Sequence, residues 1–421
     1  MSELWIANPG ELATPTGTVP LAGPRQGDVS RLRGVDVLCR EGRIAAIGPP
    51  REIAQLAGAE TERFDARGGA LVPGFVDPHT HLPWAGSRAG EFAERLAGRS
   101  YQDIAAAGGG ILSTVRATRQ AGGDELTANV TRRLDRMLAW GTTTAEAKSG
   151  YGLALEPERK QLEALAAAAA AHPVEVVPTL LAAHETPPEL RGDTDRYVEL
   201  VCSEIVPAIA RAGLAAYCDV FCETGVFSVS QSRRVLAAGA AHGLAARLHA
   251  DEFVDSGGAE LAAEIGAVTA DHLMAVSPRG IDALAASGVI AGLLPGTSFF
   301  LKKKAYAPAR RLIEAGVPVT LATDCNPGSS HTESMPMVFW LAVLELDMSV
   351  GEALTAMTLN AACSLGRGAE LGSIEVGKQA DLVVLEGAGL DDLAYHFGVH
   401  PISAVIKRGA VAFRKSPRAC G

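Results

Sequence analysis

Two histidines placed two positions apart are the clearest chemical signal in this chain. His79 and His81 follow the apolar run 71–77, which is typical of a buried strand. Side chains at positions i and i+2 of a strand point to the same face, so both imidazoles can reach one divalent ion at about 2.0–2.1 Å. The pattern is also common by chance, and two ordinary polar residues at a strand end explain it equally well.

Two further candidate ligands stand at the ends of other strand-like runs. His249 ends the run 244–249, and Asp324 follows the run 318–323. Three imidazoles and one carboxylate leave a coordination position for water, which is the pattern of a catalytic metal site. These ligands suit zinc, iron or another transition ion, and the sequence does not choose among them. Because no lysine stands where a carbamylated side chain would bridge two ions, we expect one ion.

Glu252 and His272 are expected beside this site as catalytic groups. A metal-bound water needs a base that takes its proton and an acid that protonates the leaving nitrogen. Glu252, close to His249 in the sequence, is the candidate for this proton shuttle. His272 is a candidate for orienting the water or stabilising an oxyanion, although a buried structural histidine is the alternative. Asp324 can both bind the ion and accept a hydrogen bond from the water, so the dominant base stays open.

The loops after the strands carry candidate substrate-binding groups. Arg88 lies in the loop after the two histidines, and a fixed guanidinium is the usual partner of a substrate carboxylate. A solvated surface arginine is the alternative. Tyr101, Gly108–Gly110, Lys148–Gly152 and Asp324–Ser330 are expected on loops at the same mouth. Glycine permits close backbone approach to a ligand, and a tyrosine hydroxyl can orient a polar one.

An alternation of strand-like and helix-like segments must position these side chains. Helical patterns such as 158–171 and 230–242 separate apolar runs that favour strands. The runs lie near residues 71–77, 142–146, 174–183, 216–223, 244–249, 267–271, 289–294 and 318–323. This alternation predicts a parallel sheet with right-handed crossovers, and eight units favour a closed (β/α)8 barrel. Five of the ten histidines stand at the strand ends, where barrel enzymes place their active sites.

The two ends of the chain differ from the middle. Residues 1–70 and 371–421 alternate short apolar runs with turn residues, as in Val35–Cys39 and Ile44–Ile47, which is typical of antiparallel strands. We expect both ends to form one small β-sandwich domain beside a barrel that spans residues 71–370. The sequence alone does not prove that the ends pair.

Composition excludes several classes of protein. The 421 residues are 48% apolar, which is enough to bury a large core and rules out general disorder. The net charge of -10 is the opposite of the basic surface of a nucleic-acid binder. Seven scattered cysteines indicate a reduced chain and not a disulfide scaffold. We see no secretory signal and no apolar window long enough to span a membrane, so we expect a cytoplasmic protein.

Several motifs carry a family resemblance that covers nearly the whole chain. LVPGFVDPHTH (71–81) and GSIEVGKQADLVVL (372–385) resemble the amidohydrolase superfamily. More narrowly, the chain resembles the imidazolonepropionases. This likeness rests on VDPHTHLPWAGSRAGEF (76–92), SYQDIAAAGGGI (100–111), EAKSGYGL (146–153), RLHADEF (247–253), ADHL (270–273), ATDCNPGSS (322–330) and LAYHFGVHPISAVIKRG (393–409).

The resemblance implies metal-dependent hydrolysis of 4-imidazolone-5-propanoate to N-formimino-L-glutamate, a step of histidine degradation. The residues at the matching positions would hold one zinc or iron ion; they are His79, His81, His249 and Asp324. Arg88 would bind the propanoate carboxylate. The residues expected to line the pocket or contact the ring or product are Tyr101, Tyr151, His184, Glu252, Asn326, Gly328 and Ser329.

One departure concerns Glu185 and Thr186, which stand where the family usually has small or apolar residues. A carboxylate turned into the pocket would oppose a carboxylate substrate, and we expect Glu185 to point to solvent. Lys302–Lys304 is likewise expected to be a solvated loop. His172, His242, His331, His396 and His400 receive no role, because they stand away from the predicted strand ends.

Other interpretations stay open at this point. A deaminase or another cyclic amidohydrolase would keep the same metal ligands, so the ligands do not distinguish these activities. A non-catalytic protein on the same fold would typically have lost ligands, and here all four are present. The expected partner is a small-molecule substrate, with neither nucleic acid nor membrane. A homodimer is compatible with barrels of this kind, although the sequence indicates no interface.

Overall fold

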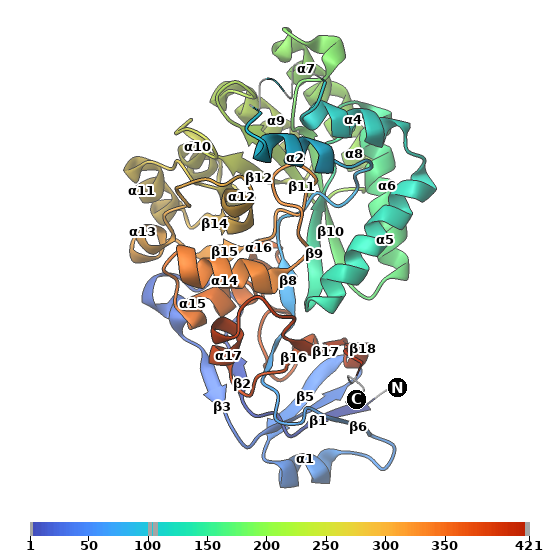
Figure 1. Ribbon diagram of the computed structural model, residues 1–421, viewed down its shortest axis with the longest axis vertical. Helices are drawn as coiled ribbons and strands as arrows, with labels where there is room; N and C mark the ends of the chain where they lie inside the picture. Colours follow the sequence, from blue (N-terminus) through green and yellow to red (C-terminus); the bar gives the residue numbers. More distant parts are fainter. Residues whose placement is uncertain (1–2, 100–102, 104–107, 417–421) are drawn as a thin grey trace.

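Eight parallel strands form the centre of the protein in a computed structural model that describes residues 3–99, 103 and 108–416 (Figure 1). Their spatial order follows the chain from β8 to β15, which confirms the predicted barrel. The strands are β8 (Phe75–Asp77), β9 (Thr142–Lys148), β10 (Glu175–Ala183), β11 (Tyr217–Cys222), β12 (Ala245–Ala250), β13 (Thr269–His272), β14 (Ile290–Leu293) and β15 (Val319–Leu321).

The segments just after β8 and β15 close this barrel. Thr80 and Cys325 form a parallel bridge. The Asp324 amide donates to the His79 carbonyl at 3.0 Å, and the His81 amide donates to the Cys325 carbonyl at 3.0 Å. The backbone that carries three of the predicted metal ligands therefore forms the contact that closes the barrel. Hydrogen bonds from both sides fix its path.

Helices cover the outside of the barrel and bury one face each. In α5 the residues Leu126, Val130 and Leu134 repeat every four positions and are fully buried. The surrounding helices are α4 (Ile111–Gln120), α5 (Gly123–Ala139), α6 (Leu155–Ala171), α7 (Thr194–Leu200), α8 (Val206–Arg211), α9 (Val229–Ala241), α10 (Gly258–Ile265), α11 (Pro278–Ser287), α13 (Ala309–Glu314), α14 (Met335–Glu345), α15 (Val350–Ala356) and α16 (Leu359–Ser364). Two further helices, α2 (Ala89–Leu96) and α12 (Pro295–Phe300), lie in loops after β8 and β14.

Serine caps set where several of these helices begin. The Ser228 side chain accepts a hydrogen bond from the Gln231 amide, and the Gln231 side chain returns the contact, which forms a capping box at the start of α9. Helix α11 begins at Pro278 after the capping residue Ser277 and ends at Gly288, whose φ of 75° suits glycine. These local signals explain why the helices start directly after the loops of the barrel mouth.

The chain ends form two further sheets at one end of the molecule (Figure 1, lower part). The four-stranded sheet has the order β5 (Arg43–Gly48), β4 (Asp36–Arg40), β1 (Glu3–Ala7), β6 (Glu62–Asp65). The six-stranded sheet has the order β18 (Ala410–Arg414), β17 (Ile402–Lys407), β16 (Leu382–Leu385), β7 (Leu71–Pro73), β2 (Leu12–Thr14), β3 (Ser30–Leu32). Side chains of both sheets, such as Ile6, Val37, Leu382 and Ile406, share one apolar core.

The run 71–77 was expected to be a single barrel strand, and the structure divides it. β7 pairs with β16 in the terminal sheet, whereas β8 pairs with β9 in the barrel. The break falls at Gly74, where an added Cβ would overlap the Thr143 side chain, so the backbone can pass between the sheets only with glycine there. The domain boundaries at residues 70 and 370 stay predictions. Among the described residues, no helix has the length and apolar character needed to cross a lipid bilayer.

Candidate metal centre and substrate cavity

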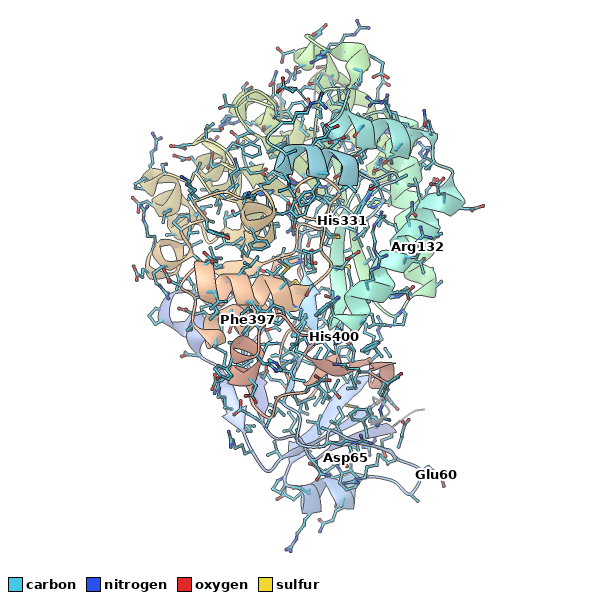
Figure 2. All side chains as sticks on the ribbon, viewed as in Figure 1. Glu60, Asp65, Arg132, His331, Phe397 and His400 are labelled. Atoms are coloured by element: carbon cyan, nitrogen blue, oxygen red, sulfur yellow. The ribbon has the colours of Figure 1, made fainter. Side chains whose placement is uncertain are left out.

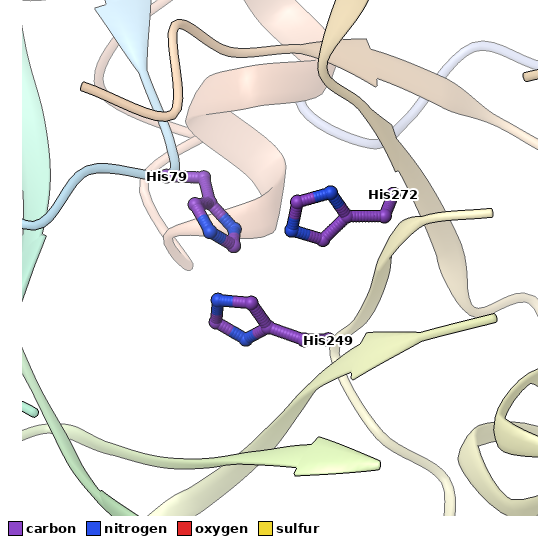
Figure 3. Close-up of side chains that lie close together, drawn as sticks. All are labelled: His79, His249 and His272. Atoms are coloured by element: carbon purple, nitrogen blue, oxygen red, sulfur yellow. The ribbon is translucent and has the colours of Figure 1, made fainter. Parts of the chain in front are cut away.

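Three imidazoles from different strands converge on one point inside the barrel mouth (Figure 3). His79 follows β8, His249 lies in β12, and His272 ends β13; one ring nitrogen of each lies within 4.8 Å of the others. A second such group joins His79 to His81 and Asp324. The structure therefore brings the four predicted ligands together, with His272 beside them.

The distances within this cluster are short. His81 Nε2 lies 3.2 Å from Asp324 Oδ1 and 3.5 Å from His249 Nε2. His79 Nε2 lies 3.6 Å from the same Asp324 oxygen. The other Asp324 oxygen accepts a hydrogen bond from Thr297 Oγ1 at 2.7 Å, which fixes the carboxylate. Nitrogen and oxygen donors thus face a common space from several sides.

Carboxylates on the far side of two imidazoles set their tautomers. His79 Nδ1 donates to Asp271 Oδ2 at 2.7 Å, and His249 Nδ1 donates to Asp219 Oδ1 at 3.1 Å. With the proton on Nδ1, Nε2 carries a free lone pair that faces the cluster. His79 Nε2 is buried and has no hydrogen-bond partner among the described residues. This orphaned acceptor fits a bound metal ion.

The same surroundings keep the imidazoles uncharged. Burial, with the nearby charge of Lys148 as a further cause, holds the pKa of His79 well below its usual range. Burial also holds the pKa of His81 well below its usual range. The neutral form is the one that ligates metal ions, so the cluster is prepared for an ion near neutral pH.

Lys148 lies inside the barrel wall and not on a mouth loop, where the sequence pattern had placed it. It ends β9, is fully buried, and puts Nζ 2.8 Å from Glu146 Oε1 and 2.9 Å from Asp219 Oδ2. Burial opposes its charge, but Asp219 and Glu146 outweigh burial and raise the pKa of Lys148. Its amine therefore stays protonated between the two carboxylates.

Glu252 and His272 lie next to each other above the cluster. Glu252 Oε2 is 3.7 Å from His272 Nε2, and both side chains are buried. Burial, and then the charge of Asp324, raises the pKa of Glu252 well above its usual range. Burial lowers the pKa of His272 to about 3. A carboxyl with a raised pKa is suited to accept and return a proton near neutral pH.

Several residues of this region, among them Asp251, His272 and Asp324, have a backbone conformation that side chains other than glycine rarely adopt. The φ angles are 51° at Asp251, 79° at His272 and 52° at Asp324. Each residue stands where a strand ends and the chain turns across the barrel mouth. Such backbone strain is concentrated at functional sites, and here it aims His272 and Asp324 at the cluster.

A cavity of about 630 Å³ opens above the cluster. Its volume falls in the range of small-molecule sites. The predicted site residues that line it are His81, Arg88, Tyr151, His184, His249, Glu252, His272, Asp324, Asn326, Gly328 and Ser329. His79 lies at the cluster itself, and Tyr101 lies outside the described residues, so its contact stays a prediction.

Arg88 is held on the cavity wall at the start of α2. Its Nε donates to Glu91 Oε2 at 2.8 Å. Its Nη1 packs against Gly328, where an added Cβ would overlap the guanidinium. The side-chain oxygen of Asn326 accepts hydrogen bonds from the amides of Gly328 and Ser329 at 2.8 Å each, which folds this loop against Arg88. The guanidinium therefore faces the cavity and not bulk solvent.

Tyr151 and His184 form the part of the cavity wall beside His81. The His184 ring stacks on His81 with centroids 5.1 Å apart, and its Nδ1 donates to the Gly150 carbonyl at 3.0 Å. Gly150 has φ of 118°, and an added Cβ there would lie 2.9 Å from His184 Nδ1. Burial raises the pKa of Tyr151, so its hydroxyl stays protonated and can donate to a ligand.

One expectation about a charged residue was wrong. Glu185 lines the cavity instead of pointing away from it, and burial raises the pKa of its carboxyl. Lys302–Lys304 form an exposed loop, as expected, but Lys303 also lines the cavity, with Nζ 5.1 Å from the centre of the Phe253 ring. In both cases the direction of a loop brings the side chain to the cavity, and residue type gave no signal of that direction.

Other lining residues had no assigned role. Arg95 lies beside the stacked rings of Phe92 and Phe300, with Cζ 5.3 Å and 5.2 Å from their centres, and Glu91 binds Arg88. Their spacing along α2 places them on one helix face, which is a signal the sequence carried. The buried partners Asp219 and Asp271 were detectable as charges inside apolar strand runs.

Histidines without a predicted role lie away from the cluster. His331 packs edge-on against Trp84, and His400 packs against Trp140 with centroids 4.4 Å apart. His400 lies near the junction of the barrel and the terminal sheets (Figure 2). These contacts are the ordinary packing of imidazoles against tryptophan rings.

Comparison with known proteins places this site in a family. Residues 104–413 match the model of the amidohydrolase family. A protein named imidazolonepropionase from Symbiobacterium thermophilum is 50% identical over 410 residues, covering 97% of this chain and 96% of its own length. The protein of the same name from Geobacillus kaustophilus is 49% identical over 416 residues, covering 98% of each chain.

Solved structures show the same fold at much lower identity. Guanine deaminase from E. coli has a TM-score of 0.74 at 17% identity and covers 99% of this chain and all of its own. An adenosine deaminase from Xanthomonas campestris with bound zinc has a TM-score of 0.67 at 20% identity, covering 97% of this chain and 92% of its own. The sequence relatives are far closer than these structures and cover nearly full length. The chain therefore belongs to the imidazolonepropionase family of the amidohydrolases.

Proposed function

We propose that the protein hydrolyses the ring amide of 4-imidazolone-5-propanoate to N-formimino-L-glutamate in histidine degradation. The observation that carries the proposal is that Arg88 lines the same cavity as His81, His249 and Asp324. A small ring with an anionic side chain requires a group that binds a carboxylate next to the groups that attack the amide. The names of relatives at 50% and 49% identity support this substrate.

Four residues are proposed to hold one zinc or iron ion: His79, His81, His249 and Asp324. The free Nε2 of His79 and the lowered pKa values of His79 and His81 fit such an ion. When bound, the ion would polarise the ring carbonyl and make water a better nucleophile. The solved adenosine deaminase of the same fold is a protein with bound zinc.

The remaining groups bind the substrate and move the proton. Arg88 pairs with the propanoate carboxylate and so orients the ring, while Tyr151 and His184 contact the ring from the wall beside His81. Glu252 takes a proton from the attacking water and returns it to the ring nitrogen as the carbon–nitrogen bond breaks. His272, 3.7 Å from Glu252, donates towards the oxygen on which negative charge develops.

The product stays in the same cavity until it is released. Asn326, Gly328 and Ser329 line the cavity beside Arg88 and are proposed to contact the ring or the open-chain product. The new carboxylate forms at the former ring carbonyl, and the proton it loses is balanced by protonation of the formimino group, so the product has one more carboxylate than the substrate. Arg95 and Lys303 line the way out and offset the charge of that carboxylate.

An assay of 4-imidazolone-5-propanoate hydrolysis, monitored through the loss of ring absorbance, tests the proposal. We expect activity that vanishes with a chelator and returns with zinc or iron. Arg88→Ala should raise KM strongly, whereas Arg132→Ala on the exposed face of α5 (Figure 2) should leave KM unchanged. A metal-loaded protein inert towards this substrate would overturn the proposal. Activity on guanine or another amino-substituted ring would then favour a deaminase.

We also propose a homodimer and a cytoplasmic location, both on the basis of the sequence alone. Light scattering of the purified chain tests the homodimer, for which we expect twice the chain mass of 43.6 kDa. A mass equal to one chain would contradict it.

A further inference from the structure

One carboxylate ties Arg88 to two other segments of the cavity wall. Glu91 lies three residues after Arg88, in the first turn of α2. Its Oε2 accepts from Arg88 Nε at 2.8 Å and from the Gly110 amide at 3.1 Å, and its Oε1 accepts from Ser113 Oγ at 2.8 Å. Glu91 therefore connects α2, the end of the glycine segment 108–110 and the start of α4.

These contacts fix the direction of the guanidinium. Glu91 occupies only Nε of Arg88, and Gly328 packs against Nη1. Within the described residues, neither Nη1 nor Nη2 makes a hydrogen bond to the protein. An arginine presents a planar fork, so holding Nε and packing Nη1 leaves the outer edge of the fork open to the cavity.

Glu91 itself is well placed to stay ionised. Burial raises its pKa, but Arg88 and Ser113 outweigh burial and lower the pKa of Glu91 below its usual value. Its side chain is 20% exposed, so the pair with Arg88 is only partly screened by water. The contact is therefore stronger than an ordinary surface ion pair, which contributes little.

We propose that Glu91 is a positioning residue that sets substrate specificity, because it holds Arg88 ready for the carboxylate of the substrate side chain. This inference rests on the proposed function, in which Arg88 binds that carboxylate. Fixing a free arginine side chain costs rotamer entropy, and Glu91 fixes Arg88 before the substrate arrives. The same carboxylate holds the backbone at Gly110 against the cavity, next to the lining residue Ile111.

The test compares ligands with and without the carboxylate on one ring. Imidazole-4-propionate has the same side chain on a ring that cannot be hydrolysed, and its amide lacks the charge. We expect Glu91→Ala to weaken inhibition by imidazole-4-propionate, and to raise KM, by about tenfold or more, since one charge-assisted contact is at stake. Inhibition by the amide should stay unchanged, and kcat should change less than KM.

Two further variants separate position from charge. Glu91→Gln keeps an oxygen that can accept from Arg88 Nε and the Gly110 amide, so we expect it to recover most of the carboxylate preference. Glu94→Ala is the matched control on the same helix, because exposed Glu94 pairs only with Arg99 among the described residues. It should behave as the wild type. In an Arg88→Ala background, Glu91→Ala should have little further effect on KM, because both changes remove the same contact.

Several results would overturn the inference. One is an equal loss of affinity for imidazole-4-propionate and its amide in Glu91→Ala, which would indicate a general collapse of the wall. Another is a Glu91→Gln variant that behaves as Glu91→Ala does. That result would show that Glu91 acts through its charge and not by positioning Arg88. Unfolding midpoints close to that of the wild type check that the variants fold. One outcome separates the two proposals: the wild type prefers the carboxylate probe but does not hydrolyse the proposed substrate. That outcome would contradict the proposed function and would still support the role of Glu91.

Discussion

His79 Nδ1 lies 2.7 Å from Asp271 Oδ2, although 192 residues separate them in the chain. Both side chains are buried below the cavity. Arg247, fully buried, places Nη2 3.6 Å from the same Asp271 oxygen and donates to the Pro78 carbonyl at 2.8 Å. Gly292 leaves the space that Asp271 needs, because an added Cβ there would overlap its carboxylate. The position of His79 is thus set from inside the barrel.

The first prediction concerns the affinity for metal. Asp271→Asn should weaken zinc binding about 10- to 100-fold, because the amide no longer fixes the proton on His79 Nδ1. Competition with a chromophoric chelator measures this affinity, and Asp282→Asn on the exposed face of α11 is the control. Unchanged zinc affinity in Asp271→Asn would mean that the carboxylate has only a packing role.

The second prediction concerns the close approach of Gly328 to Arg88. Gly328→Ala should push the guanidinium out of place, because the new methyl group would occupy its position. We expect KM to rise roughly tenfold to a hundredfold, the value of one hydrogen-bonded contact to a charged group. Steady-state kinetics measure the effect. Gly123→Ala, where an added Cβ meets nothing within 4 Å, should leave KM unchanged, and a similar KM for both variants would contradict the prediction.

The sequence predicts the parts of the site that are local. His79 and His81 stand at the carboxyl end of one predicted strand, and Asp324 follows another. The carboxyl ends of parallel strands meet at one mouth of a barrel, so the sequence is enough to predict that these three residues lie close together. The alternation of apolar runs and amphipathic helices likewise predicts the eight parallel strands.

The rest depends on contacts that only the closed barrel creates. Asp271 reaches His79 across the barrel interior, and Asp219 reaches His249 from the neighbouring strand, so neither partner follows from spacing. Glu185 and Lys303 stand in loops whose direction is set by packing at the mouth, so the sequence did not show that both line the cavity. The division of the run 71–77 at Gly74 depends on how close the Thr143 side chain approaches Gly74, and this distance does not follow from the sequence.

The third prediction concerns the buried ammonium of Lys148. Lys148→Met keeps the side-chain volume but leaves Glu146 and Asp219 without their cation inside the barrel. Removing one partner from a buried ionic group costs about 3–5 kcal/mol of stability. Urea unfolding followed by circular dichroism should show a clearly lower midpoint than the wild type. Lys304→Met in the exposed loop is the control, and equal midpoints for the two variants would refute the prediction.

The last prediction concerns acid and the junction between the barrel and the terminal sheets. Glu175, at the start of β10, lies 3.1 Å from Lys407 Nζ at the end of β17 and also pairs with Arg408. Burial raises the pKa of Glu175, but Lys407 and Arg408 outweigh burial and lower it from 4.5 to about 2.

A carboxyl whose pKa is lower in the folded chain stabilises the fold above its unfolded pKa, and this stability is lost as the pH falls towards the folded pKa. We therefore expect the wild type to be more stable than Glu175→Gln at pH values above about 5, with the difference shrinking between about pH 4.5 and 2. Thermal unfolding midpoints across this range measure it, and Glu163→Gln on the exposed face of α6 should differ from the wild type at no pH. A difference between wild type and Glu175→Gln that stays constant with pH would show that the charge of Glu175 does not hold the junction.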